Sequence, residues 1–109
     1  MLLVTSSGEV SLTRGDTARL TVSVTNDIGE PYIIQPEDTL TLSVKKSTKD
    51  TEYLFQKTIK GYDTFHIEPE DTKPLDFGKY KYDVEIITEN GEVYTVIPPT
   101  VFKILEEVT

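Results

Sequence analysis

Several segments of the chain alternate apolar and polar residues, and this period of two constrains the fold more than any other feature. The clearest segments are Ala18–Val24, Thr39–Lys46 and Tyr80–Ile86. Successive side chains of a β-strand point to opposite faces, so the alternation predicts strands with one buried face and one face in water. No window of about 11 residues gives a convincing helical period. We therefore expect an all-β chain.

The residue composition supports the same fold class. The strand-favouring types Thr, Val, Ile, Tyr and Phe make up 45 of the 109 residues, whereas Ala, the best helix former, occurs once. A chain of this length suits one domain with a buried core. We expect residues 1–109 to form a single domain of seven or eight short strands, paired antiparallel in a two-sheet sandwich.

Turn-forming residues separate the expected strands. Asn90-Gly91 lies between Val84–Thr88 and Val93–Ile97 and predicts a hairpin with a type I′ turn, which requires a positive φ at both central residues. Pro98-Pro99 is expected to end or kink the strand after that hairpin, because proline cannot donate to a β-ladder. Thr100–Leu105 is then expected to resume as a last edge strand.

The tetrapeptide Pro-Glu-Asp-Thr occurs twice, at Pro36–Thr39 and at Pro69–Thr72. The flanking sequences differ, which argues against an internal duplication. We interpret both copies as one local device, in which Pro opens a turn and Asp or Thr caps backbone N–H groups. The segment Ile67–Thr72 is expected to form a single helical turn.

The segment Asp76-Phe77-Gly78-Lys79-Tyr80 has the Asp-x-Gly-x-Tyr form of a tyrosine corner. In that feature, a tyrosine near the start of a strand returns its hydroxyl to upstream backbone at the edge of a sandwich. The alternative is an ordinary strand tyrosine. Asp76, Gly78 and Tyr80 are predicted to form the corner, which makes the expected fold an immunoglobulin-like antiparallel β-sandwich.

The balance of charge argues against two classes of partner. The chain has 11 Lys and Arg against 19 Asp and Glu, which leaves a net charge of −8. Nucleic-acid binding depends on clustered basic side chains, and anionic membranes attract basic segments. We therefore expect neither nucleic acid nor membrane as a partner.

Residues that carry most enzyme chemistry are scarce. The chain has no Cys and one His, so thiolate sites and multi-histidine metal sites are excluded. His66 alternates with Phe65 and Ile67, which places it on the solvent face of a strand, with no nucleophile or acid tied to it by a motif. No phosphate-binding loop, metalloprotease motif or nucleophile elbow occurs. We predict no catalytic residue, no cofactor, no metal site and no enzymatic activity.

Clustered carboxylates are the remaining source of chemistry. They occur at Glu37-Asp38, Glu70-Asp71 and Glu106-Glu107, without the Asp-x-Asp-x-Asp-Gly spacing of a calcium loop. Carboxylates from separate loops could still meet around calcium, or act as an acid/base pair in glycoside hydrolysis. The interpretation that we favour is a solvated acidic surface that keeps the domain soluble.

Sheet edges are the expected contact surface, because an unpaired edge can recruit a partner by strand addition. The candidate residues are Leu2, Leu3 and Val4 near the N-terminus and Val101, Phe102, Lys103 and Ile104 near the C-terminus. The alternative is that both segments pair within the domain.

Three successive features resemble small β-sandwich domains of phage tail and baseplate proteins. Arg14-Gly15-Asp16-Thr17 opens a strand, Asn26–Tyr32 forms an Asn-x-x-Gly turn cluster, and Leu40–Lys46 forms the next strand. The pattern is similar to that of the N-terminal domain of phage baseplate upper proteins and of short structural proteins encoded by prophages. It covers Leu12–Lys46, while Phe65–Ile97 looks like the second half of an immunoglobulin-like domain.

The resemblance implies a non-enzymatic virion structural or assembly module that is made in the bacterial host cytoplasm and is associated with the tail or baseplate. Its implied partners are other phage structural proteins, and a homo-oligomer is compatible with it. The resemblance assigns no catalytic residue to this chain.

A host-surface or carbohydrate-binding immunoglobulin-like module is the alternative function. Tyr32, Tyr53, Tyr62 and Tyr94 could supply aromatic platforms for a sugar. The acidic residues could coordinate sugar hydroxyls or a calcium ion.

Overall fold

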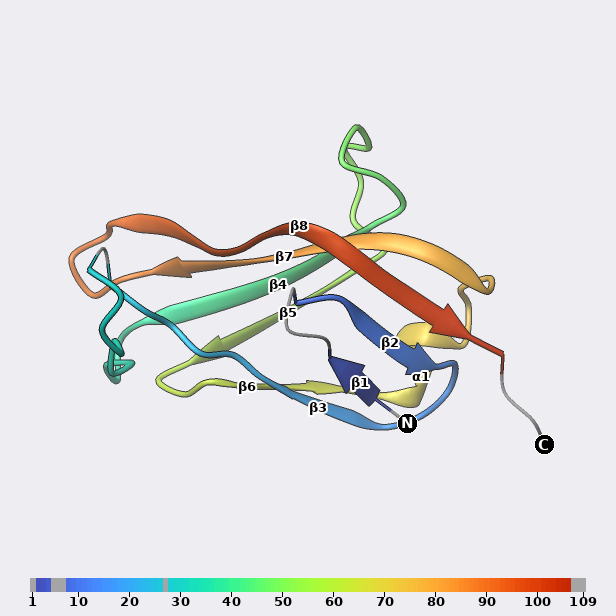
Figure 1. The fold of residues 1–109 in the computed structure, drawn as a ribbon, viewed down its shortest axis with the longest axis horizontal. Coiled ribbons are helices and arrows are strands. Elements are labelled where there is room, and N and C mark those ends of the chain that lie inside the picture. The colour runs from blue at the N-terminus through green and yellow to red at the C-terminus, as the bar shows by residue number, and fades with distance from the viewer. Residues whose placement is uncertain (1, 5–7, 27, 107–109) are drawn as a thin grey trace.

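The computed structural model describes residues 2–4, 8–26 and 28–106, and of residues 2–4 it describes the backbone. These residues form eight strands and one short helix (Figure 1). The strands are β1 (Leu2–Val4), β2 (Val10–Thr13), β3 (Ala18–Thr21), β4 (Thr39–Lys45), β5 (Phe55–Lys60), β6 (Thr64–Ile67), β7 (Gly78–Ile87) and β8 (Val93–Leu105), and the helix is α1 (Pro69–Thr72). The prediction of an all-β chain is confirmed.

The strands form two sheets of unequal size. Six strands make one mixed sheet in the order β1-β2-β8-β7-β4-β5, and β3 pairs with β6 in a second, two-stranded sheet. Neighbouring strands are antiparallel except β2 and β8, which run parallel from Val10 opposite Phe102 to Thr13 opposite Leu105. The prediction of a wholly antiparallel fold is wrong at this pair. A parallel pair needs a long crossover, and the chain between β2 and β8 supplies it.

Both sheets contribute to one hydrophobic core. Its buried members are Val10, Leu12, Ala18, Leu20, Val22, Leu40, Leu42, Val44, Ile59, Phe65, Ile67, Tyr82, Val84, Ile86, Phe102 and Ile104. The ring of Phe102 contacts Phe55 and Tyr82 edge-on, with ring centroids 6.0 Å and 5.8 Å away. Edge-to-face pairs at this spacing stabilise a core beyond the area that they bury.

The alternation in the sequence sets which face of each strand is buried. In β7, Tyr82, Val84 and Ile86 are buried, while the residues between them point to the opposite, outer face. In β6, His66 is exposed and lies directly opposite Arg19 of β3. His66 therefore lies on the solvent face, as predicted.

The hairpin between β7 and β8 lies where Asn90-Gly91 predicts it, but its turn differs. The Thr88 N–H donates to the Glu92 carbonyl at 2.8 Å, and the Gly91 N–H donates to the Thr88 carbonyl at 2.9 Å. Gly91 has a φ of 84°, whereas no non-glycine residue in the described part of the chain has a positive φ. The prediction of a type I′ turn is therefore wrong. The loop is a three-residue connection that ends in a left-handed glycine.

Strand β8 continues through Pro98-Pro99 instead of ending there. The two prolines fall where the ladder with β7 shifts register, between the pairs Tyr82–Thr100 and Val84–Ile97. An irregularity of this kind accommodates residues that cannot donate to the ladder.

The prediction that Val101, Phe102, Lys103 and Ile104 form an open edge is wrong. From Phe102 onward, β8 pairs with β2 on one side and β7 on the other, and Val101 adjoins this doubly paired stretch. Phe102 and Ile104 are core residues. Strand β1, with Leu2, Leu3 and Val4, does lie at an edge of the large sheet. The side chains of Leu2–Val4 lie outside the described part, so their role stays a prediction.

Both Pro-Glu-Asp-Thr copies use the same capping contact. Asp71 Oδ2 accepts the Glu68 N–H at 2.8 Å at the start of α1, and Asp38 Oδ2 accepts the Gln35 N–H at 2.8 Å. In each copy the Asp carboxylate therefore bonds the backbone N–H three residues before it. The interpretation of one local device used twice is confirmed. In the α1 copy, Asp71 also forms an ion pair with Lys57 of β5, at a distance of 2.7 Å.

The Tyr80 hydroxyl donates to the Asp76 carbonyl at 2.7 Å, four residues upstream. Gly78 between them has a φ of 144°, a conformation that favours glycine. The half-buried ring of Tyr80 packs against the core. This hydrogen bond is the one that a tyrosine corner requires.

Candidate functional site

Three loops gather at the end of the molecule opposite α1 (Figure 1). We call this end, made of residues 22–26, 28–38, 61–63 and 88–96, the loop end. Backbone hydrogen bonds tie the loops together: Val22 N–H to the Asp63 carbonyl at 2.9 Å, and Gly61 N–H to the Asp38 carbonyl at 2.9 Å. The first loop also closes on itself, where the Tyr32 N–H donates to the Val24 carbonyl at 2.8 Å.

Two hollows open at the loop end. The first has a volume of about 400 Å³ and lies between residues 23–26 and the β7–β8 hairpin. The second, of about 410 Å³, lies between residues 22–24, 31–34 and 61–63. Ser23, Val24 and Tyr32 line both, so the two hollows adjoin along one extended segment. Volumes of this size can hold a small organic ligand or one or two side chains of a partner.

A buried carboxylate anchors these loops. Asp38 is fully buried, and its Oδ2 accepts the Tyr32 hydroxyl at 2.5 Å and the Gln35 N–H at 2.8 Å. Its Oδ1 accepts the Glu89 N–H of the β7–β8 hairpin at 3.0 Å. A buried charge is tolerated when hydrogen bonds satisfy it, and here three donors converge on one carboxylate. Asp38 thereby fixes the first loop to the hairpin.

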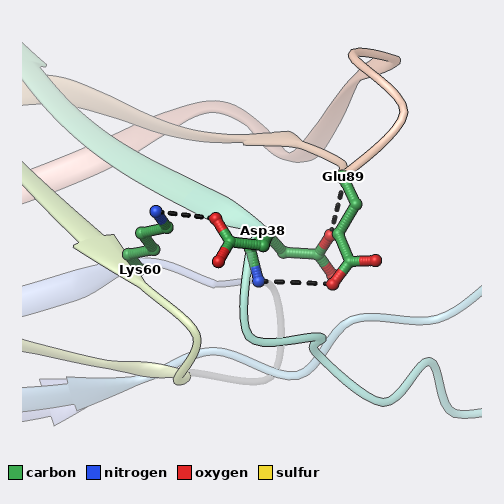
Figure 2. Close-up of polar contacts among 4 residues, drawn as sticks. Asp38, Lys60 and Glu89 are labelled. Carbon is green, nitrogen blue, oxygen red and sulfur yellow. Dashed lines mark hydrogen bonds and ion pairs between the residues drawn. The ribbon is translucent and has the colours of Figure 1, made fainter.

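A second set of polar contacts, made by exposed side chains, joins the same first loop to the hairpin and to β5. Figure 2 shows Asp38, Lys60 and Glu89, with the hydrogen bond between Asp38 and Glu89 among the dashed lines. The Glu37 N–H donates to Glu89 Oε1 at 3.3 Å, and the Lys60 ammonium pairs with Glu37 Oε2 at 2.7 Å. Both Lys60 and Glu37 are well exposed, so this pair adds little stability compared with the buried carboxylate.

The hydrogen bond between Tyr32 and Asp38 shifts the pKa of both groups. Burial raises the pKa of Asp38, but the bonds from Tyr32, Gln35 and Glu89 outweigh it, so the pKa lies below its ordinary value. The bond to Asp38, together with burial, raises the pKa of Tyr32 to about 12. At neutral pH, Tyr32 is a neutral donor and Asp38 a charged acceptor, which is the strong form of the contact.

Large apolar side chains are exposed at the loop end. Ile28 and Ile33 are each 78% exposed, and Tyr62, Val93 and Tyr94 are each at least half exposed. Ile33 and Tyr62 line the second hollow, and Tyr94 lines the first. Scattered exposed apolar residues are ordinary, but three that line adjoining hollows, as Ile33, Tyr62 and Tyr94 do, are typical of a contact surface.

The structure separates the four tyrosines proposed as sugar platforms. Tyr32 and Tyr94 line the first hollow, Tyr32 and Tyr62 line the second, and Tyr53 lies away from both, beneath the Lys45 ammonium at 4.9 Å. Tyr53 is therefore not part of this site. Ile28 and Ile33 were missed from the sequence, although two isoleucines in a turn-rich segment outside any alternating strand are a usable signal.

The acidic clusters do not converge in the part of the chain that the structure describes. Among residues 8–26 and 28–106, no three Asp, Glu or His side chains are grouped so that they could hold a metal ion. Within the described ranges no helix has the length and apolar character needed to span a bilayer.

Comparison with known proteins finds no match: no family model, no curated protein and no solved structure is similar to this chain.

Proposed function

We propose that this chain is an immunoglobulin-like β-sandwich module of a phage virion, encoded by a prophage, associated with the tail or baseplate, and acting through protein–protein contacts rather than catalysis. The observation that carries the proposal is the group of exposed Ile28, Ile33, Tyr62, Val93 and Tyr94 at the loop end. Apolar side chains in these positions lose unfavourable contact with water when a partner covers them.

The arrangement of strands supports the immunoglobulin-like part of the proposal. Two sheets enclose one core, β2 joins the large sheet parallel to the last strand, and the Tyr80–Asp76 hydrogen bond lies at the start of β7. Sandwiches of this kind carry their binding loops at the two ends of the strands. The loop end occupies such a position (Figure 1).

The anchoring of the loops also supports a contact role. Asp38 and its three donors hold the first loop and the hairpin in one conformation before any partner arrives. A preorganised surface loses less conformational entropy when it binds.

Peptide mass spectrometry of phage particles purified after prophage induction tests the proposal. We expect to recover this chain in a fixed ratio to tail or capsid proteins. Recovery from induced cells but not from particles would contradict the virion role and favour an assembly factor. Expression that does not depend on induction would overturn the phage assignment altogether.

A carbohydrate-binding module is the second candidate, and the lining of the first hollow favours it. Tyr32 and Tyr94 share this hollow with the hydroxyl and amide groups of Ser23, Asn26 and Thr88. Aromatic faces with a few polar groups are the usual composition of a sugar site. A glycan array, probed with and without calcium, should show signals that Tyr94→Ala abolishes if this candidate holds. An array without signals would remove it.

A further inference from the structure

The outer face of β7 carries a pattern of charges that lies outside the loop end. Its outward side chains are, in order, Lys79, Lys81, Asp83, Glu85 and Ile87. The buried residues between them face the core, so all four charges lie on the same side of the sheet. The strand therefore runs from a basic half to an acidic half along one exposed face.

Neighbouring strands enlarge the basic half. Lys45 of β4 lies directly opposite Lys81, and Lys103 of β8 lies directly opposite Lys79. Like charges that face each other across a ladder destabilise a sheet. In the described part of the chain none of the four lysines has an ion-pair partner, and the Lys45 ammonium lies over the ring of Tyr53. Four lysines are thus held together, at a cost in stability, on a protein whose net charge is −8.

We propose that this outer face is the interface of a twofold-symmetric dimer, in which the lysines of one copy meet Asp83 and Glu85 of the second copy. A twofold interface must be self-complementary, because each contact is made twice with the roles exchanged. A face that is basic in one half and acidic in the other meets that requirement. The dimer does not depend on the virion assignment, because it rests on a different face of the molecule.

The charge pattern also selects the orientation of the second copy. A twofold axis parallel to β7 would set Lys81 against Lys81. An axis across the strands, between Lys81 and Asp83, reverses the strand direction of the second copy. It sets Lys81 against Asp83 and Lys79 against Glu85, with Lys45 and Lys103 alongside. Sheets that pack face to face with nearly aligned strands are common.

The shape of the face is compatible with this arrangement. A hollow of about 60 Å³ lies close to the proposed axis, lined by Lys45, Lys81 and Asp83 among others. The loop of residues 46–54 projects from the body next to β4 (Figure 1). In the dimer it lies over β4 and β5 of the second copy, where the outward side chains Thr41 and Thr58 are small.

Charge reversal in two separate variants tests the dimer. One variant is Lys79→Glu/Lys81→Glu, and the other is Asp83→Lys/Glu85→Lys. In sedimentation velocity at moderate salt, we expect wild type to dimerise and each variant to associate at least about tenfold more weakly, because like charges then face each other. An equimolar mixture of the two variants should form a heterodimer, since the outward charges of β7 are then all acidic in one variant and all basic in the other.

A matched control distinguishes a loss of interface contacts from an effect of the overall net charge on association. Glu30→Lys/Glu70→Lys changes the net charge as much as Asp83→Lys/Glu85→Lys does, but at exposed positions away from the outer face. This control should dimerise at least as well as wild type, because the general repulsion between copies is reduced. A wild type that is monomeric at every concentration, or variants that associate as wild type does, would overturn the proposal. Loss of association in the control as well would overturn it too.

Discussion

Replacing Phe102 by Pro is expected to unfold the domain. Phe102 is fully buried in the central part of the large sheet, between Val10 of β2 and Tyr80 of β7. The substitution deletes a ring that packs edge-on against Phe55 and Tyr82, and a loss of this size costs about 3–5 kcal/mol in a core. It also removes a backbone donor from a strand that is paired on both sides.

The two losses together are comparable with the whole stability of a domain, which is about 5–15 kcal/mol. Far-ultraviolet circular dichroism should therefore show loss of strand structure at room temperature. Phe102→Leu is the matched control. It keeps the backbone donor and most of the apolar volume, so it should fold with a lower urea midpoint. A folded Phe102→Pro protein with a native-like midpoint would mean that this segment is an outer edge after all.

Replacing Asp38 by Asn is expected to lower the free energy of unfolding by about 3 kcal/mol at neutral pH. The side chain keeps its shape, but it loses its charge and one acceptor oxygen. One of the three donors, the Tyr32 hydroxyl or the N–H of Gln35 or Glu89, then faces an amide N–H₂ group. Urea unfolding measures the change. Glu37→Gln, which alters the neighbouring exposed ion pair with Lys60, should cost far less.

The effect of Asp38→Asn should depend on pH in a definite direction. The pKa of Asp38 is lower in the folded protein than its ordinary value of 3.8. The unfolded chain therefore binds the proton first, and the stabilisation by the carboxylate is fully present above pH 3.8 and is lost as the pH falls through the folded pKa. The difference in unfolding free energy between wild type and Asp38→Asn should be constant near neutrality and shrink in acid. A difference that stays the same down to acid unfolding would contradict the role of the charge.

The local elements of this fold could be predicted from the sequence because local rules govern them. Alternation identified the buried faces of β3, β4 and β7, and Asn90-Gly91 located the hairpin. The two Pro-Glu-Asp-Thr segments were recognised as one capping device. Each of these inferences needs only residues that are close in sequence.

Features that depend on residues far apart in sequence were predicted wrongly or missed. The C-terminal segment was placed at an edge, because nothing within residues 100–105 signals that β2 pairs with it in parallel. Pro98-Pro99 was expected to end or kink a strand; the strand continues, and a register shift in the ladder with β7 accommodates both prolines. Asp38 looked like one member of a solvated acidic pair. Its burial depends on Tyr32 and on Glu89, which lies 51 residues away.

The candidate site was predictable only in part. Tyr32, Tyr62 and Tyr94 were named as possible aromatic platforms for a sugar, and all three line the hollows of the loop end. Tyr53 fitted the same criterion but lies on a different face, because the loop of residues 46–54 carries it toward Lys45. Composition identified the aromatic residues, but only the fold shows which of them share a surface.

The loop end is, in our central proposal, the contact surface of a virion protein. The most direct measurement is the amount of this chain in purified particles when the wild-type gene is replaced by Ile33→Glu or by Phe77→Glu. Ile33 is exposed at the loop end, and Phe77 is exposed at the opposite end beside Arg14, so both variants should fold. We predict that Ile33→Glu is lost from particles and that Phe77→Glu is retained at the wild-type ratio. Equal retention of both variants would contradict the account.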